Sequence, residues 1–163
     1  MPLLIEPYQS TYCAALSAMY EDLDAHSKTL GLPPTTTGQR EQWLDHLTGA
    51  GLNLVALDDG NVVGHVAAVP AKEGESQLVV FVHQEYQNRG IGTELLKQLV
   101  AYADNKGVEA IKLTVALNNR RAITVYDNMG FDVIERMQGE LAMRLSLDRP
   151  IVDEVKRPPA EQQ

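Results

Sequence analysis

The chain has 163 residues, 44% of them hydrophobic and 22% charged, a composition that fits one globular domain and excludes a disordered or fibrous protein. The formal net charge of −8 argues against a nucleic-acid-binding surface, which needs clustered cations, and against an anionic membrane surface. No apolar run can cross a bilayer, the first residues lack a signal-peptide pattern and Cys13 is the only cysteine, so we expect a cytoplasmic protein.

In the first half of the chain, short apolar runs alternate with amphipathic segments. Apolar residues at helical spacing predict a first helix, and an irregular loop rich in proline and threonine follows it. Branched residues on both sides of an Asp-Gly turn predict a hairpin. In chain order we expect a strand at 3–5, helices at 10–23 and 38–48 around a loop at 26–37, and strands at 52–57 and 62–69.

The second half alternates strands and helices. The nearly continuous apolar run at 77–82 predicts a central strand buried on both faces. A long helix after Gly90 ends at Gly107, and a strand at 110–115, a helix at 119–129 and strands at 131–135 and 140–147 follow. Such alternation favours parallel pairing, while the hairpins add antiparallel pairs, so the fold class is α/β with a mixed sheet (α+β). We expect a single domain over 1–148 and a flexible tail at 149–163.

A glycine-containing loop, Gln87-Asn88-Arg89-Gly90-Ile91-Gly92, joins the central strand to the long helix. Its glycines permit close backbone approach, and the free amides at a helix start bind phosphate oxygens. The loop therefore predicts a pyrophosphate site, assisted by Arg89, with an ordinary strand-to-helix turn as the alternative. The spacing fits neither a dinucleotide fingerprint, because Leu95 stands at the third small position, nor a P-loop, because Thr93-Glu94 follows the second glycine.

A second motif lies downstream, Asn-x-x-Ala-x-x-x-Tyr-x-x-x-Gly-Phe from Asn119 to Phe131. Together with the preceding Gln-x-x-Gly-x-Gly at a helix start, it resembles the GCN5-related N-acetyltransferase (GNAT) superfamily. The resemblance covers Leu78 to Phe131 most strongly. It implies an acyl-CoA N-acyltransferase fold, with a central mixed sheet of roughly six to seven strands flanked by about four helices, and a single GNAT-like domain.

The resemblance also implies acetyl-CoA as the acyl-donor cosubstrate. By matching positions, its pyrophosphate would lie on the glycine loop, and its pantetheine arm would lie where the strand ending near Val82 separates from the strand starting near Ala110. Asn119 would hydrogen-bond the arm, although an Asn at a helix start equally serves as a cap. The implied donor-binding residues are Phe81, Val82, Gln87, Asn88, Arg89, Gly90, Ile91, Gly92, Thr93 and Asn119.

The expected catalytic residues are Tyr126, which the resemblance implies, and Glu85, which lies just past the central strand and belongs to no motif that fixes its role. Tyr126 matches the family's general acid, and a phenol with a reference pKa near 10 stays protonated at neutral pH and can donate to a departing thiolate. Helix periodicity leaves a second interpretation open, in which Tyr126 only packs. The acceptor amine must lose a proton, and Glu85 is the expected base; His83 is the alternative, and each could instead be structural.

The expected function is direct transfer of an acetyl group to a primary amine of a small molecule, a peptide N-terminus or a lysine. A non-catalytic acyl-CoA-binding or sensing module is the alternative, since it needs the loop but not Tyr126. Scattered histidines predict no metal site. We expect no partner among nucleic acids or membranes, and a possible homodimer through the last strand, at 141–147.

Overall fold

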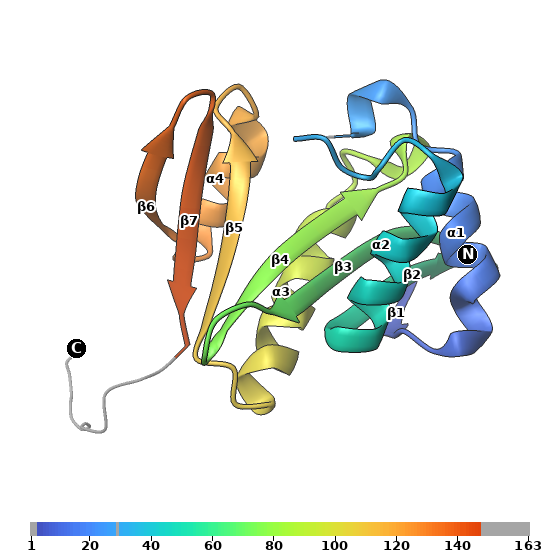
Figure 1. Cartoon of the computed structure of the whole chain (residues 1–163), viewed down its shortest axis with the longest axis horizontal. Helices are drawn as coiled ribbons and strands as arrows, with labels where there is room; N and C mark the ends of the chain where they lie inside the picture. Colours follow the sequence, from blue (N-terminus) through green and yellow to red (C-terminus); the bar gives the residue numbers. More distant parts are fainter. Residues whose placement is uncertain (1–2, 29, 148–163) are drawn as a thin grey trace.

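The computed structural model of the chain describes residues 3–28 and 30–147, without the side chain of His26, so the expected tail at 149–163 lies outside the described residues. The strands form one seven-stranded sheet in the order β1-β2-β3-β4-β5-β7-β6 (Figure 1). Its strands are β1 (Leu4–Pro7), β2 (Leu52–Asp58), β3 (Asn61–Pro70), β4 (Glu75–Val82), β5 (Ala110–Ala116), β6 (Asp132–Met137) and β7 (Glu140–Ser146).

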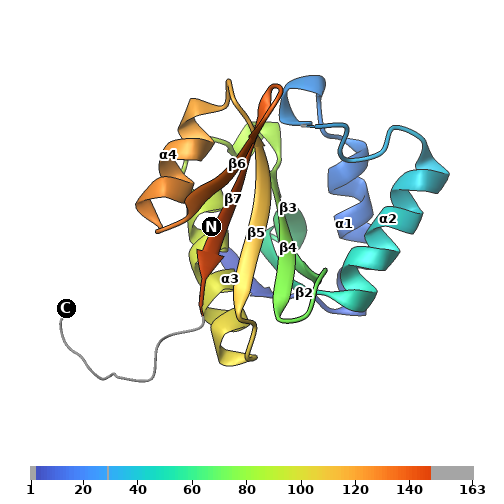
Figure 2. The same cartoon turned by 60° about the vertical axis from the view of Figure 1, so that its left-hand side comes forward.

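Helices cover the two faces of the sheet in separate pairs, with α1 and α2 on one side and α3 and α4 on the other (Figure 2). The helices are α1 (Cys13–Glu21), α2 (Thr37–Ala50), α3 (Ile91–Asn105) and α4 (Arg120–Asn128), and short 3₁₀ turns are η1 (Ser10–Tyr12), η2 (Ala25–Ser27) and η3 (Gln84–Tyr86). Among the described residues, no helix is long and apolar enough to span a membrane. The mixed-sheet fold predicted from the sequence is confirmed.

The alternation of side chains along each strand explains the two layers. Leu78 packs into the core under α3, whereas Phe81, three residues further along β4 and so on the opposite face, packs with the residues of α1 and α2. The apolar stripe of α3 is buried as its spacing predicts, and consists of Ile91, Leu95, Leu96, Leu99 and Ala103. Two hydrophobic cores therefore hold β4 from opposite sides.

A gap in the middle of the sheet separates β4 from β5. The two strands run parallel and pair only at Glu75–Ala110, Ser76–Ile111 and Gln77–Lys112, and from there they diverge (Figure 1). Beyond Gln77, the backbone edge of β4 that faces β5 has no strand partner within residues 3–28 and 30–147. An open strand edge of this kind can accept an extended ligand by hydrogen bonding, as an added strand does.

Parallel pairing in the second half of the chain is confined to β4 and β5, against our broader expectation. The strand β7 inserts between β5 and β6 and is antiparallel to both. The expected dimer strand is therefore internal, and β6 is the free edge at that end of the sheet. The prediction that β4 is buried on both faces is also wrong: Val79, Val80 and Val82 are only half-buried because the gap opens beside them, and β3 is the fully buried strand.

A buried polar chain fastens α1 to the sheet. The Tyr20 hydroxyl lies 2.7 Å from His65 Nδ1, and His65 Nε2 lies 2.7 Å from Asn53 Oδ1, while the Asn53 amide donates to the carbonyls of Leu47 and Gly51. Burial lowers the pKa of His65 to about 3 and raises that of Tyr20 well above its usual range, so both are neutral. The chain fixes the helix layer against which Phe81 packs, because the Tyr20 and Phe81 rings lie 5.5 Å apart.

Candidate active site

The loop after β4 turns sharply into α3. Asn88 and Gly90 both have positive φ, at 64° and 81°, and Gly90 is the N-cap of α3. A left-handed residue costs least at glycine, so the turn itself requires Gly90. Its geometry places the free amides at the start of α3 beside the end of β4.

Gly92 is needed for a different reason. Its φ is not positive, and an added Cβ would meet only Val82 Cγ2, at an ordinary contact distance of 3.5 Å. The protein could therefore accommodate a side chain there, but that side chain would enter the space beside Val82. The absence of a side chain at Gly92 leaves this space open.

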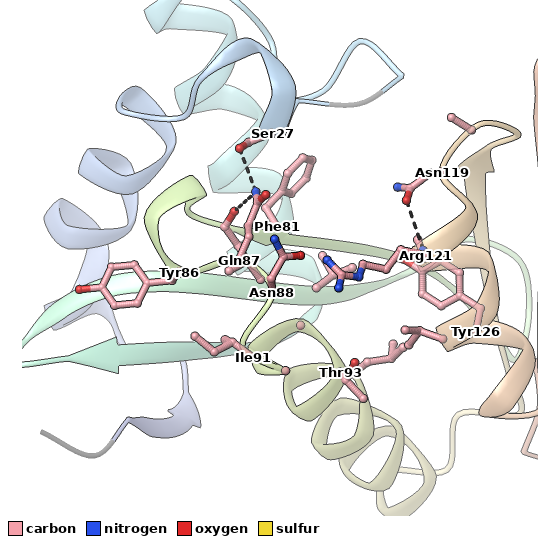
Figure 3. Close-up of a pocket in the computed structure, with 18 of the residues that line it drawn as sticks. Ser27, Phe81, Tyr86, Gln87, Asn88, Ile91, Thr93, Asn119, Arg121 and Tyr126 are labelled. Carbon is pink, nitrogen blue, oxygen red and sulfur yellow. Dashed lines mark hydrogen bonds between the residues drawn. The ribbon is translucent and has the colours of Figure 1, made fainter.

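A cavity of about 840 Å³ lies between the glycine loop, α3 and α4. In Figure 3, Asn88, Ile91 and Thr93 come from the loop and α3, whereas Arg121 and Tyr126 come from α4 on the other side. All of the predicted donor-binding residues line this cavity except Arg89. The Arg89 guanidinium instead stacks over the Tyr86 ring at 5.1 Å and donates to the Glu85 carbonyl.

Five polar residues that line this cavity were not among the predicted site residues: Ser27, Lys28, Tyr86, Asn118 and Arg121. The Gln87 side-chain amide donates to Ser27 Oγ and to the Val82 carbonyl, both at 2.9 Å, and so ties the end of η2 to the glycine loop (Figure 3). Arg121 lies inside the recognised motif, where a basic residue facing a phosphate loop could have been noticed. Ser27 and Lys28 carry no local signal, because only the fold brings them to the site.

Asn119 performs the cap role that the sequence allowed. Its Oδ1 accepts a hydrogen bond from the Ala122 amide at 3.2 Å, at the N-terminus of α4 (Figure 3). This bond uses the carboxamide oxygen only. The carboxamide nitrogen remains a donor toward the cavity, so capping and ligand binding are compatible.

Tyr126 lies on α4 and lines the cavity with a half-buried side chain. Its ring packs against Phe131 at 5.7 Å, but among the described residues its hydroxyl has no hydrogen-bond partner. Burial raises the pKa of Tyr126 to about 12. The residue is thus a protonated donor at neutral pH, and packing alone does not account for its hydroxyl.

A second cavity of about 360 Å³ opens on the opposite face of the sheet. Gln77, Val79 and Thr114 point to that face, and Leu30 and Leu32 from the segment between α1 and α2 close it. The residues shared by the two cavities are Val80, Phe81, Asn119 and Tyr126. The cavities therefore meet at the gap between β4 and β5, beside the tyrosine.

The expected base is placed apart from both cavities. Glu85 is exposed on η3 and lines neither of them. His83 is buried, with Nδ1 accepting from the Glu85 amide at 3.1 Å and Nε2 lying 2.7 Å from Asp22 Oδ2. His83 Nδ1 thus caps η3, while Nε2 holds the loop to the end of α1.

The comparison with known families agrees with this geometry. The profile of the Acetyltransferase (GNAT) family matches residues 16–131. The chain belongs to the GNAT family. Similar GNAT proteins include the L-amino acid N-acetyltransferase AaaT of Escherichia coli, 29% identical over 124 residues, which are 73% of this chain and 76% of that protein.

Other GNAT relatives are longer or more distant. An uncharacterized N-acetyltransferase of Methanocaldococcus jannaschii is 36% identical over 92 residues, 52% of this chain, which spans only 41% of that protein. The structure of yncA of Salmonella typhimurium, solved with its cofactor acetyl-CoA, superposes with a TM-score of 0.76 over 92% of this chain and 96% of that one, at 23% identity. This last similarity shows a shared fold.

The first cavity fits the acetyl-CoA that GNAT enzymes use. It offers an open strand edge on β4, free amides at the start of α3, the space left at Gly92, and cationic side chains at Lys28 and Arg121. These features match an extended amide-containing arm that ends in phosphates. Among the described residues, no group of three or more acidic, histidine or cysteine side chains could hold a metal ion.

Proposed function

We propose that this GNAT protein transfers the acetyl group of acetyl-CoA directly to a primary amine. The observation that carries the proposal is the meeting of two cavities, one from each face of the sheet, at the gap beside Tyr126. Such an arrangement lets a donor and an acceptor approach each other without an acyl-enzyme. Holding two reactants in this way supplies much of the rate enhancement in transfer reactions.

In this proposal the donor lies in the larger cavity. Bound acetyl-CoA supplies an activated thioester. The amides of the turn at Gly90 and the cations Lys28 and Arg121 bind its phosphates, the free edge of β4 at Phe81 and Val82 binds its amide-containing arm, and Asn119 donates to that arm. Together these contacts direct the donor's reactive end toward Tyr126.

Tyr126 then assists the departure of the thiolate. Its pKa of about 12 lies above the reference value of about 8.5 for a thiol, so the phenol stabilises the sulfur anion chiefly as a hydrogen-bond donor. A proton that it gives up is replaced from the acceptor side, because the amine loses a proton on forming the amide. An acceptor that arrives as an ammonium must also lose one proton before it can attack. Glu85, exposed on η3, is proposed to accept this proton through water and to pass it to solvent.

The acetylated product is the direct test. Purified protein is incubated with acetyl-CoA and a pooled panel of amines, including free L-amino acids because the E. coli relative bears that name, and products are identified by mass spectrometry. The proposal expects an acetylated amine and stoichiometric free thiol, both absent without protein. Binding of acetyl-CoA with no product from any amine would favour the sensing module instead.

A further inference from the structure

The lining of the second cavity carries negative charge only. Most of its lining side chains are apolar, although Gln77, Thr114, Asn119 and Tyr126 add polar groups, and Glu140 is the one charged side chain among the described residues that line it. No lysine, arginine or histidine belongs to this lining. The apolar side chains are Leu30, Leu32, Leu78, Val79, Val80, Phe81, Leu113 and Val115.

Glu140 is close to the junction of the two cavities. It begins β7 and is the register partner of Ala116 at the end of β5, and Ala116 lines the donor cavity. Register partners share a sheet face, so Glu140 lies on the same face as Thr114, another residue of the second cavity. Glu140 is half-buried, which strengthens its attraction for a cation relative to a fully exposed carboxylate.

The cations of β5 and β7 on this face lie too far away to serve the same ligand. Lys112 and Arg144 are register partners, four residues from the Ala116–Glu140 pair, or roughly 13 Å along the strands. Arg144 Nε also lies 3.2 Å from Glu75 Oε2 and is thereby engaged. In a free amino acid the carboxylate and the ammonium share one carbon, so an amino acid held at Glu140 would have its carboxylate out of reach of Lys112 and Arg144.

Resting on the proposed function, we infer that Glu140 binds the ammonium group of the acceptor, and that this cavity selects a small apolar amine without a carboxylate beside its amino group. The apolar walls take the body of the amine, and its nitrogen points past Glu140 toward Tyr126. A free amino acid is rejected twice, by repulsion from Glu140 and by the desolvation of its carboxylate against leucine and valine side chains.

The test uses three acceptors of one shape: L-leucine, L-leucinamide and 3-methylbutylamine. Initial rates of thiol release are measured with saturating acetyl-CoA. The amine pKa of leucinamide is close to that of an α-amino group, about 8, and that of 3-methylbutylamine close to that of lysine, about 10.4. The amine pKa of leucine lies between these two values. Amine basicity therefore cannot make both of the other amines better acceptors than leucine. We expect kcat/KM for each to exceed that for leucine by about tenfold or more.

Glu140→Gln keeps the size of the side chain and removes its charge. We expect it to raise KM for 3-methylbutylamine by about 10- to 100-fold, with a smaller change in kcat, and to reduce the discrimination against leucine. The matched control is Glu135→Gln, an exposed carboxylate on neighbouring β6 that lies outside the cavity. Unchanged acetyl-CoA affinity and melting temperature in both variants establish that the fold and the donor site are intact.

The outcomes separate the two proposals. Leucine as the best of the three acceptors, or an unaltered KM in Glu140→Gln, would overturn the assignment of Glu140 and leave the transferase in place. Absence of thiol release with every amine, while acetyl-CoA still binds, would overturn the transferase proposal and this inference with it.

Discussion

A single substitution at Tyr126 separates the chemical role of its hydroxyl from the packing of its ring. Its hydroxyl has no partner among the described residues, and its ring contact with Phe131 would survive in Tyr126→Phe. We expect this substitution to lower kcat by about 100-fold or more, the range for loss of a positioned proton donor, and to leave acetyl-CoA affinity and thermal stability nearly unchanged. Steady-state kinetics and a thermal melt measure both; unchanged turnover would remove Tyr126 from the mechanism.

His65 makes the fold sensitive to acid. Its pKa is about 3 in the folded protein and near 6.5 when unfolded, so between these values the unfolded chain binds the extra proton. The stability associated with a neutral His65 is therefore complete above pH 6.5 and declines as the pH falls toward 3, by at most about 1.4 kcal/mol per unit. Urea unfolding at pH 7, 6 and 5 measures this decline.

The comparison variant is His65→Gln, which does not titrate. Loss of the bonds to Tyr20 and Asn53 lowers the stability of this variant at pH 7. As the pH falls, however, its free energy of unfolding should decrease less steeply than that of the wild type. Parallel curves would show that His65 does not cause the acid sensitivity.

At the start of α3, a substitution at Gly92 can change ligand binding without changing the fold. Gly92→Ala introduces a Cβ that the protein tolerates, at 3.5 Å from Val82 Cγ2, into space assigned to the donor. We predict normal folding and an acetyl-CoA affinity reduced by about tenfold, the cost expected for overpacking a contact surface. Gly49→Ala in α2, where an added Cβ meets nothing within 4 Å, is the control and should stabilise slightly without affecting affinity. Equal affinities in the two variants would contradict the assignment of this space.

The elements were predictable where their signals are local. The apolar spacing of α3 and the turn at 58–61 gave the correct elements, because periodicity and turn chemistry act within a few residues. The insertion of β7 between β5 and β6 was not predictable, since strand order depends on packing between distant segments. For the same reason the motif residues were found from the sequence, whereas Ser27, Lys28 and Glu140 required the fold.

At the scale of the whole molecule, β6 is an exposed edge. Val133 and Ile134 remain 52% and 47% exposed, and apolar residues on an open edge favour pairing with another copy. We predict that the homodimer, left possible by the sequence, forms through β6 and that Ile134→Lys yields monomers. Light scattering after gel filtration measures the mass, and a monomeric wild type at tens of micromolar would contradict the prediction.

The central claim is that the cavity between the glycine loop and α4 binds acetyl-CoA. Calorimetric titration of the purified protein with acetyl-CoA, with NADH as the control, tests it most directly. We expect saturable binding of one acetyl-CoA per chain and no binding of NADH, because the loop lacks the spacing of a dinucleotide fingerprint. If acetyl-CoA produces no binding heat at any accessible concentration and does not raise the melting temperature, the loop at 87–92 is only a turn and the proposed function is wrong.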